Sequence, residues 1–81
     1  MPTMTAIDHR AEKIKVTSKE LIIYFVDGRR LEVPLRWFPK LRKASSRQRN
    51  KYRFVGGGLG IHWPDIDEDL SINGLIGLEN D

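Results

Sequence analysis

The fold of this 81-residue chain is decided by residues 13–34, which read KIKVTSKELIIYFVDGRRLEVP. Apolar and polar residues alternate over residues 13–17 and again over 30–33, which is the period of a strand with one buried face. Between them, residues 20–26 are mostly apolar and rich in β-branched and aromatic side chains, as is typical of a central strand. The stretch therefore predicts three consecutive antiparallel strands that form a meander.

Two turns separate the predicted strands. Ser18-Lys19 forms the first, a tight turn. Asp27-Gly28 is a strong hairpin signal, because a type I′ turn needs positive φ at both central residues and these two residue types tolerate it. Pro34 ends the third strand, since proline lacks the N–H group that a strand ladder requires.

One helical segment follows the meander. Pro39 suits the first turn of a helix, and the residues after it show a stripe at spacings of three and four residues. The stripe consists of Leu41, Ala44, Gln48 and Tyr52. Ser45 and Gln48 have the spacing of a capping box, so we expect either one helix or two short helices with a restart near Ser45.

A second short hairpin is expected after the helix. Residues 52–55 and 59–63 have the character of strands, and the glycines at 56–58 form a turn or bulge between them. An acidic turn then leads to Ser71, which can cap a last helix that stops at Gly77. The fold class is therefore α+β, with a three-stranded antiparallel meander, one basic amphipathic helix that can be split, a second short β-hairpin and a short C-terminal helix.

Length and composition bound the class of protein. A chain of 81 residues, 40% of them hydrophobic, supports one small domain, which we place at residues 13–78 between a flexible lead-in (1–12) and a tail (79–81). The sequence has no cysteine, which excludes disulfides and thiolate metal sites and fits a reducing cytoplasm. No stretch approaches the roughly 20 apolar residues of a membrane span, so we expect a cytoplasmic protein without membrane contact.

Charge is divided along the chain. Residues 36–53 carry eight cations and no acid, whereas residues 65–81 carry six acids and no lysine or arginine. Either the acidic segment pairs with the basic one, or the basic segment binds an anionic partner. If that partner is a nucleic acid, binding is independent of sequence and weakens with salt. The candidate nucleic-acid contacts are Arg42, Lys43, Arg47 and Arg49.

The glycine-rich and acidic stretches complete no known cofactor or metal site. Four glycines fall within residues 56–60, but no Lys-Ser or Lys-Thr pair follows to reach phosphate and magnesium, so a P-loop is excluded. Residues 65–69 match the first three ligand positions of a calcium loop, yet Leu70 and Ile76 stand where that loop needs glycine and glutamate. We therefore predict no cofactor and no metal.

His62 is the candidate centre of an enzymatic site. Asp65 and Asp67 are the nearby carboxylates that could assist it, but they do not supply a full zinc ligand set or a nucleophile with its base. We therefore predict no catalytic residues and place an enzyme centred on these three residues third among the hypotheses.

Aromatic residues form the candidate surface for a protein partner. Trp37 and Phe38 directly precede the helical segment, and His62 and Trp63 end the second hairpin. For the Trp37-Phe38 pair the alternative is that it folds back onto the sheet as part of the core. The candidate partner-binding residues are Trp37, Phe38, His62 and Trp63.

The chain resembles the bacterial and phage DUF2442 family over about residues 13–78. The resemblance is carried by residues 27–41, Arg49, residues 56–71 and Gly74-Leu75. It implies a small α+β domain of the NE0471 N-terminal type, and it supplies no catalytic residues to transfer. The resemblance also implies a partner, because members of this family look like partners of a small DUF4160 protein. The arrangement suggests a toxin–antitoxin-like pair.

These observations lead to two expectations of different classes. The first is a non-enzymatic protein-interaction domain of a small bacterial or phage protein, the antitoxin-like member of a pair with a DUF4160-type partner. The alternative is a nucleic-acid-binding or regulatory protein that uses residues 36–53. A homodimer that covers an exposed sheet edge is compatible with either.

Overall fold

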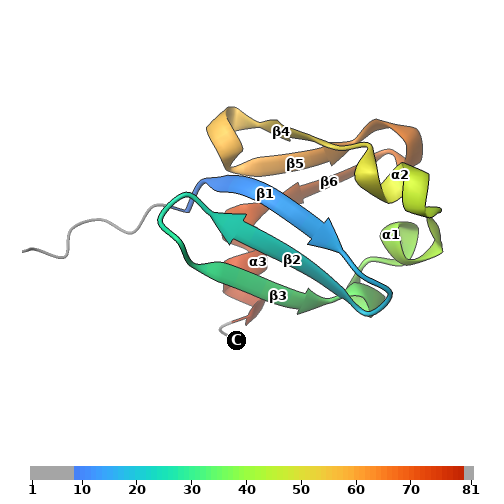
Figure 1. Ribbon diagram of the computed structural model, residues 1–81, viewed down its shortest axis with the longest axis horizontal. Coiled ribbons are helices and arrows are strands. Elements are labelled where there is room, and N and C mark those ends of the chain that lie inside the picture. Colours follow the sequence, from blue (N-terminus) through green and yellow to red (C-terminus); the bar gives the residue numbers. More distant parts are fainter. Residues whose placement is uncertain (1–8, 80–81) are drawn as a thin grey trace, which may run out of the picture.

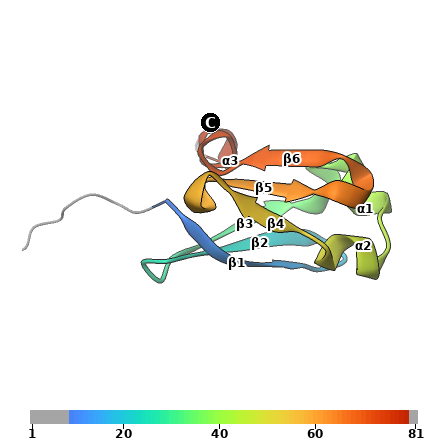
Figure 2. The same ribbon diagram turned by 90° about the horizontal axis from the view of Figure 1, so that it is seen from above.

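Two three-stranded antiparallel sheets pack against each other in the computed structural model, which describes residues 9–79 and the side chains of residues 9–77. Figure 1 and Figure 2 show the first sheet as one layer, with the second sheet and the C-terminal helix as the other. Two short helices lie at one end of the molecule (Figure 1). The α+β class and the first meander that we predicted are confirmed.

The first sheet has the strand order β1-β2-β3. Its strands are β1 (Ala11–Val16), β2 (Glu20–Phe25) and β3 (Arg30–Pro34). Leu21 and Ile23 are fully buried on the inner face, as the apolar run of β2 predicts. Residues 1–8 of the predicted lead-in and residues 80–81 of the predicted tail lie outside the described residues.

The β2–β3 turn is not the type I′ turn that we predicted. Gly28 has φ +95°, but Asp27 does not have positive φ. The Gly28 N–H donates to the Phe25 carbonyl and the Phe25 N–H to the Arg29 carbonyl, which makes a three-residue loop ending in a left-handed glycine. The carboxylate of Asp27 accepts hydrogen bonds from the backbone N–H and the Nε of Arg29, at 3.2 and 2.8 Å, and holds this alternative loop.

The helical segment is split, as the capping box indicates. A 3₁₀ turn, η1 (Leu35–Trp37), is followed by α1 (Pro39–Lys43) and α2 (Ser46–Asn50). The Ser45 hydroxyl accepts a hydrogen bond from the Gln48 N–H, and the Gln48 side chain accepts one from the Ser45 N–H. Because the chain changes direction at Ala44, the predicted apolar stripe does not lie on one helix face.

The second sheet contains a strand that we did not predict. Its order is β4-β5-β6, with β4 (Arg53–Val55), β5 (Gly60–Trp63) and β6 (Glu68–Ser71), where we expected only an acidic turn after β5. A 3₁₀ turn, η3 (Pro64–Ile66), and Asp67 at φ +51° reverse the chain between β5 and β6. We did not predict β6 because Leu70 is its one apolar residue, so its sequence shows no clear alternation of apolar and polar residues.

The last helix begins where we predicted but runs further. In α3 (Ile72–Glu79) the Ser71 hydroxyl accepts a hydrogen bond from the Gly74 N–H, which confirms the cap. Gly77 does not stop the helix, because it has no positive φ and takes a helical conformation instead of the left-handed one of a C-terminal cap. No helix in the described part of the chain is both long and apolar enough for a membrane span.

One hydrophobic core joins the two sheets, η1, α1 and α3. Trp63 is fully buried within it, and its indole N–H donates to the Arg49 carbonyl at 3.0 Å. Every large side chain with less than 2% exposure comes from a strand, η1, α1 or α3. These residues are Trp63, Leu21, Ile23, Leu35, Leu41, Ile61, Ile72 and Val33.

The glycine cluster has a structural role in this fold. Gly56, Gly57 and Gly58 form the turn η2 (Gly56–Gly58), and all three have positive φ. A Cβ on Gly58 would lie 2.9 Å from the carbonyl oxygen and 3.2 Å from the nitrogen of Ala11. The turn therefore packs directly on the first residue of β1, which only glycine allows.

We predict that Gly58→Ala lowers the free energy of unfolding more than Gly57→Ala does. Both substitutions place a Cβ at positive φ, which costs about 1–2 kcal/mol, but a Cβ on Gly57 has no atom within 4 Å. The clash at Gly58 adds about another 1–3 kcal/mol. Urea denaturation followed by circular dichroism measures both, and equal losses would contradict the close approach.

Candidate functional site

His62 does not meet the carboxylates that we assigned to it. It lies on the outer face of the second sheet, and its Nδ1 is 2.7 Å from Oδ1 of Asp69 on the neighbouring strand β6. Asp65 instead lies 3.4 Å from the Lys51 ammonium. In the part of the chain that the structure describes, no three His, Asp or Glu residues are placed to hold a metal ion. The site for which the geometry gives most support lies elsewhere.

The acidic turn lies beside α1 and α2 and provides partners for some of the cations of the basic segment. Lys51 pairs with Asp65, and the Lys40 ammonium donates to the carbonyl oxygen of Asp67 at 3.0 Å. Apart from Arg49, which donates to backbone carbonyls, five other cations of the segment form no ion pair with any carboxylate whose side chain is described. These are Arg36, Arg42, Lys43, Arg47 and Arg53. Internal pairing therefore explains only a minority of the charges.

Arg49 is a structural residue, although we predicted it as a nucleic-acid contact. Its Nε donates to the Leu41 carbonyl at 3.0 Å, and its Nη2 donates to the Arg42 carbonyl at 2.8 Å. Both carbonyls belong to the last turn of α1, where helical N–H partners run out, and the Leu41 carbonyl also accepts the Ala44 N–H at 3.2 Å. The side chain of Arg49, on α2, thus caps the C-terminal end of α1, and this cap uses its Nε and Nη2 groups.

The four aromatic candidates do not form one exposed surface. Phe38 is 7% exposed and Trp63 is fully buried, so both belong to the core. Trp37 is 41% exposed, and His62 is half-buried on the second sheet. The expectation that the Trp37-Phe38 pair folds into the core is thus right for Phe38 and wrong for Trp37.

The 3₁₀ geometry of η1 explains this separation. Residues three apart in a 3₁₀ turn point in the same direction. Leu35 and Phe38 both face the core, at 1% and 7% exposure, and Trp37 between them must face solvent. A large aromatic side chain is therefore held at the surface by two buried neighbours.

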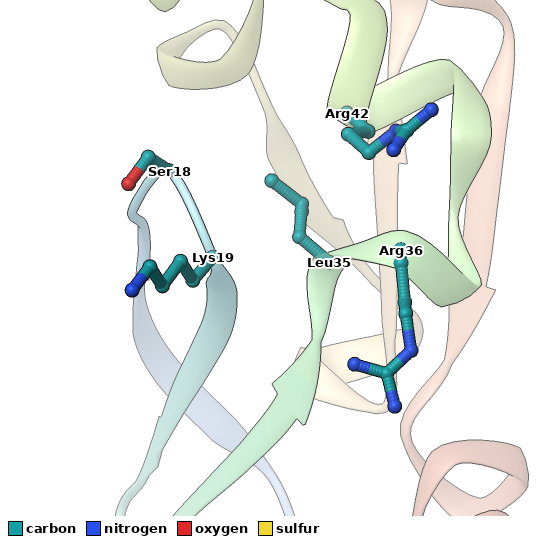
Figure 3. A pocket seen from close by; sticks show the side chains of 5 residues that line it. All are labelled: Ser18, Lys19, Leu35, Arg36 and Arg42. Carbon is teal, nitrogen blue, oxygen red and sulfur yellow. The ribbon is translucent and has the colours of Figure 1, made fainter.

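A pocket of about 260 Å³ opens at the same end of the domain. The turn between β1 and β2 provides one wall, and η1 with α1 provides the other. Figure 3 shows Ser18 and Lys19 on one side, Arg36 and Arg42 on the other, and Leu35 between them. The three charged groups point away from one another in this view, as like charges do. Its lining residues are Ser18, Lys19, Leu35, Arg36 and Arg42.

Sequence reasoning missed the Ser18-Lys19 wall of this pocket. The register of the meander could have revealed it, since Glu20 pairs with Pro34 and the Leu35 N–H donates to the Lys19 carbonyl at 2.8 Å. That pairing brings the first turn next to the start of η1. The pocket is thus a consequence of the strand register and not of any local motif.

Fold and site together define a small α+β domain of two packed antiparallel sheets with a cationic pocket at one end. Residues 11–80 match the family model described as "Protein of unknown function (DUF2442)". The chain belongs to this family, which confirms the resemblance seen in its sequence.

A solved structure shares the fold. The chain is 33% identical to a protein of unknown function from Rhodospirillum rubrum ATCC 11170, with a TM-score of 0.71, and the match covers 84% of each chain. No curated protein sequence matches this chain significantly.

We predict that Arg49→Ala lowers the free energy of unfolding, whereas Arg47→Ala leaves it nearly unchanged. Arg49 makes two hydrogen bonds from a charged donor, and their loss in a partly exposed place costs about 1–2 kcal/mol. Arg47 is exposed and serves as the matched control on the same helix. Urea denaturation of both variants measures the difference, and a comparable loss for both would refute the capping role.

Proposed function

We propose that this chain is a non-enzymatic protein-interaction domain of the cytoplasm, the antitoxin-like member of a two-protein system with a DUF4160-type partner. The partner docks at the cationic end, which we define as the β1–β2 turn, η1 and α1. The single observation that carries this proposal is the exposure of Trp37 beside cations that have no carboxylate partner among the described side chains.

The physical argument rests on what each type of side chain contributes to an interface. Tryptophan and arginine are enriched among the residues that carry most of the binding energy. Trp37 offers a rigid apolar surface, Arg36 precedes it in η1, and Arg42 lies on the following helix α1. Unpaired cations around an aromatic anchor select a partner with an acidic surface and accelerate its association.

We predict that the chain forms a complex with a DUF4160-type protein, and that Trp37→Ala weakens the complex at least tenfold, about 1.4 kcal/mol. Val26→Ala is the control, because Val26 is 42% exposed in the β2–β3 loop, at the opposite end of the first sheet. Isothermal titration calorimetry of the purified pair measures both variants. Absence of a complex, or equal losses for the two variants, would refute the proposal.

The five unpaired cations favour one alternative, which is binding of nucleic acid. Lys43 and Arg47 are exposed on α1 and α2, next to Arg42. Each helix has five residues and is about 7 Å long, which is too short to read a groove, so such binding would be nonspecific. Phosphate contacts of this kind release counterions and depend steeply on salt.

The alternative predicts that a 20-nucleotide single strand binds and that about four contacts make its affinity fall about fiftyfold between 50 and 200 mM salt. The triple variant Arg42→Gln, Lys43→Gln, Arg47→Gln must then lose both the affinity and most of the salt slope. Arg49 is left unchanged, because its loss would disturb the fold. Fluorescence anisotropy measures the slope, and a salt-independent or undetectable signal would exclude this alternative.

A further inference from the structure

We infer that the pocket between the β1–β2 turn and α1 receives a carboxylate side chain from an acidic segment of the partner protein, with an apolar residue beside that carboxylate resting on Trp37. This inference rests on the proposed function and specifies what the cationic end recognises. The observations that carry it are the lining of the pocket, the lack of a carboxylate partner for its cations among the described side chains, and the exposure of Trp37 directly after the lining residue Arg36.

The lining of the pocket combines three cations with an apolar residue. Lys19, Arg36 and Arg42 supply ammonium and guanidinium groups, Ser18 supplies a hydroxyl, and no acid lines the pocket. Leu35 lies between the two walls (Figure 3). A glutamate side chain matches this arrangement, because its carboxylate can accept hydrogen bonds from the arginines.

The pocket is large enough to hold a carboxylate side chain. Its volume of about 260 Å³ corresponds to eight or nine water molecules at about 30 Å³ each. The charged groups diverge in Figure 3, and they belong to long exposed side chains that can rotate toward a bound anion. Partial exclusion of water by Leu35 and by the incoming peptide strengthens each charge–charge contact.

The surroundings favour an acidic peptide over a nucleic-acid backbone. A phosphodiester chain that leaves the pocket across α1 approaches the acidic turn, which Lys40 and Lys51 hold against the helices. Repeated like charges along that path oppose a polyanion. A peptide with one or two acidic residues can place them in the pocket and turn its apolar residues toward Trp37.

Matched peptides and matched protein variants test the inference. We would titrate the ¹⁵N-labelled full chain with the peptide acetyl-GELEG-amide and with acetyl-GQLQG-amide, and follow the backbone amides of Ser18, Lys19, Leu35 and Arg36. We expect the glutamate peptide to shift these signals, and the glutamine peptide to bind about tenfold or more weakly, because it lacks the charge.

The double variant Arg36→Gln, Arg42→Gln removes two charges from the pocket, and Lys43→Gln, Arg47→Gln removes two exposed charges that do not line it. We expect the first pair to weaken peptide binding about tenfold and the second less than about threefold. Equal effects of the two pairs would reduce the site to general charge attraction and overturn the inference. Lys19→Gln, on the opposite wall, gives an independent test if the first pair disturbs the spectrum of the fold.

The outcomes separate this inference from the proposed function. If the chain binds its DUF4160-type partner and neither pocket variant weakens the complex, the function stands and the pocket assignment is wrong. Shifts at the pocket amides with a single-stranded oligonucleotide but not with the glutamate peptide would also overturn it. Loss of partner binding in Arg36→Gln, Arg42→Gln but not in Lys43→Gln, Arg47→Gln would support it.

Discussion

The hydrogen bond from the buried indole N–H of Trp63 to the carbonyl of Arg49 holds the cationic end of this domain in place. Helices of five residues do not form in water on their own, because each must fix several residues for few hydrogen bonds. The bond ties α2 to the core of the second sheet, and the Arg49 side chain then caps α1 through the carbonyls of Leu41 and Arg42. The bond satisfies the buried indole N–H. Arg49 anchors both short helices, α2 through its own carbonyl and α1 through its side chain. The position of Arg42 on the pocket wall therefore depends on a tryptophan of the opposite layer.

The other wall of the pocket depends on strand register. A shift of one residue between β2 and β3 would exchange the inner and outer faces of both strands, and the burial of Leu21 opposite Val33 prevents it. The same register brings Lys19 to the start of η1 through its hydrogen bond with Leu35. Leu35 then packs into the core and forces Trp37 outward. Core packing thus fixes the two surface features, the pocket and the exposed indole, on which the proposed recognition rests.

Much of this fold could be predicted from local patterns, and the failures have physical causes. The meander follows from period-two alternation, and the split helix from the Ser45–Gln48 capping box. Strand β6 was missed because its charged and polar residues hide the alternation, and it becomes a strand only through pairing with β5. The candidate site was harder to predict. The pairing of Arg49 with helix carbonyls, the burial of Phe38 and Trp63, and the Ser18-Lys19 wall all depend on contacts between distant segments, which no local spacing encodes.

In three dimensions the acidic and basic segments of the sequence are only partly paired with each other. The acidic turn does lie against the basic segment, but it engages Lys51 and Lys40 on the side of the second sheet. The cations of the pocket, contributed by η1, α1 and the β1–β2 turn, are left without carboxylates among the described residues. One end of the domain therefore has an acidic region and a cationic region side by side. Such an arrangement attracts a short anionic group in one position and repels a long polyanion that extends beyond it. A partner with a compact acidic segment satisfies both conditions, and the direction of the charge separation would also fix the orientation in which that partner docks.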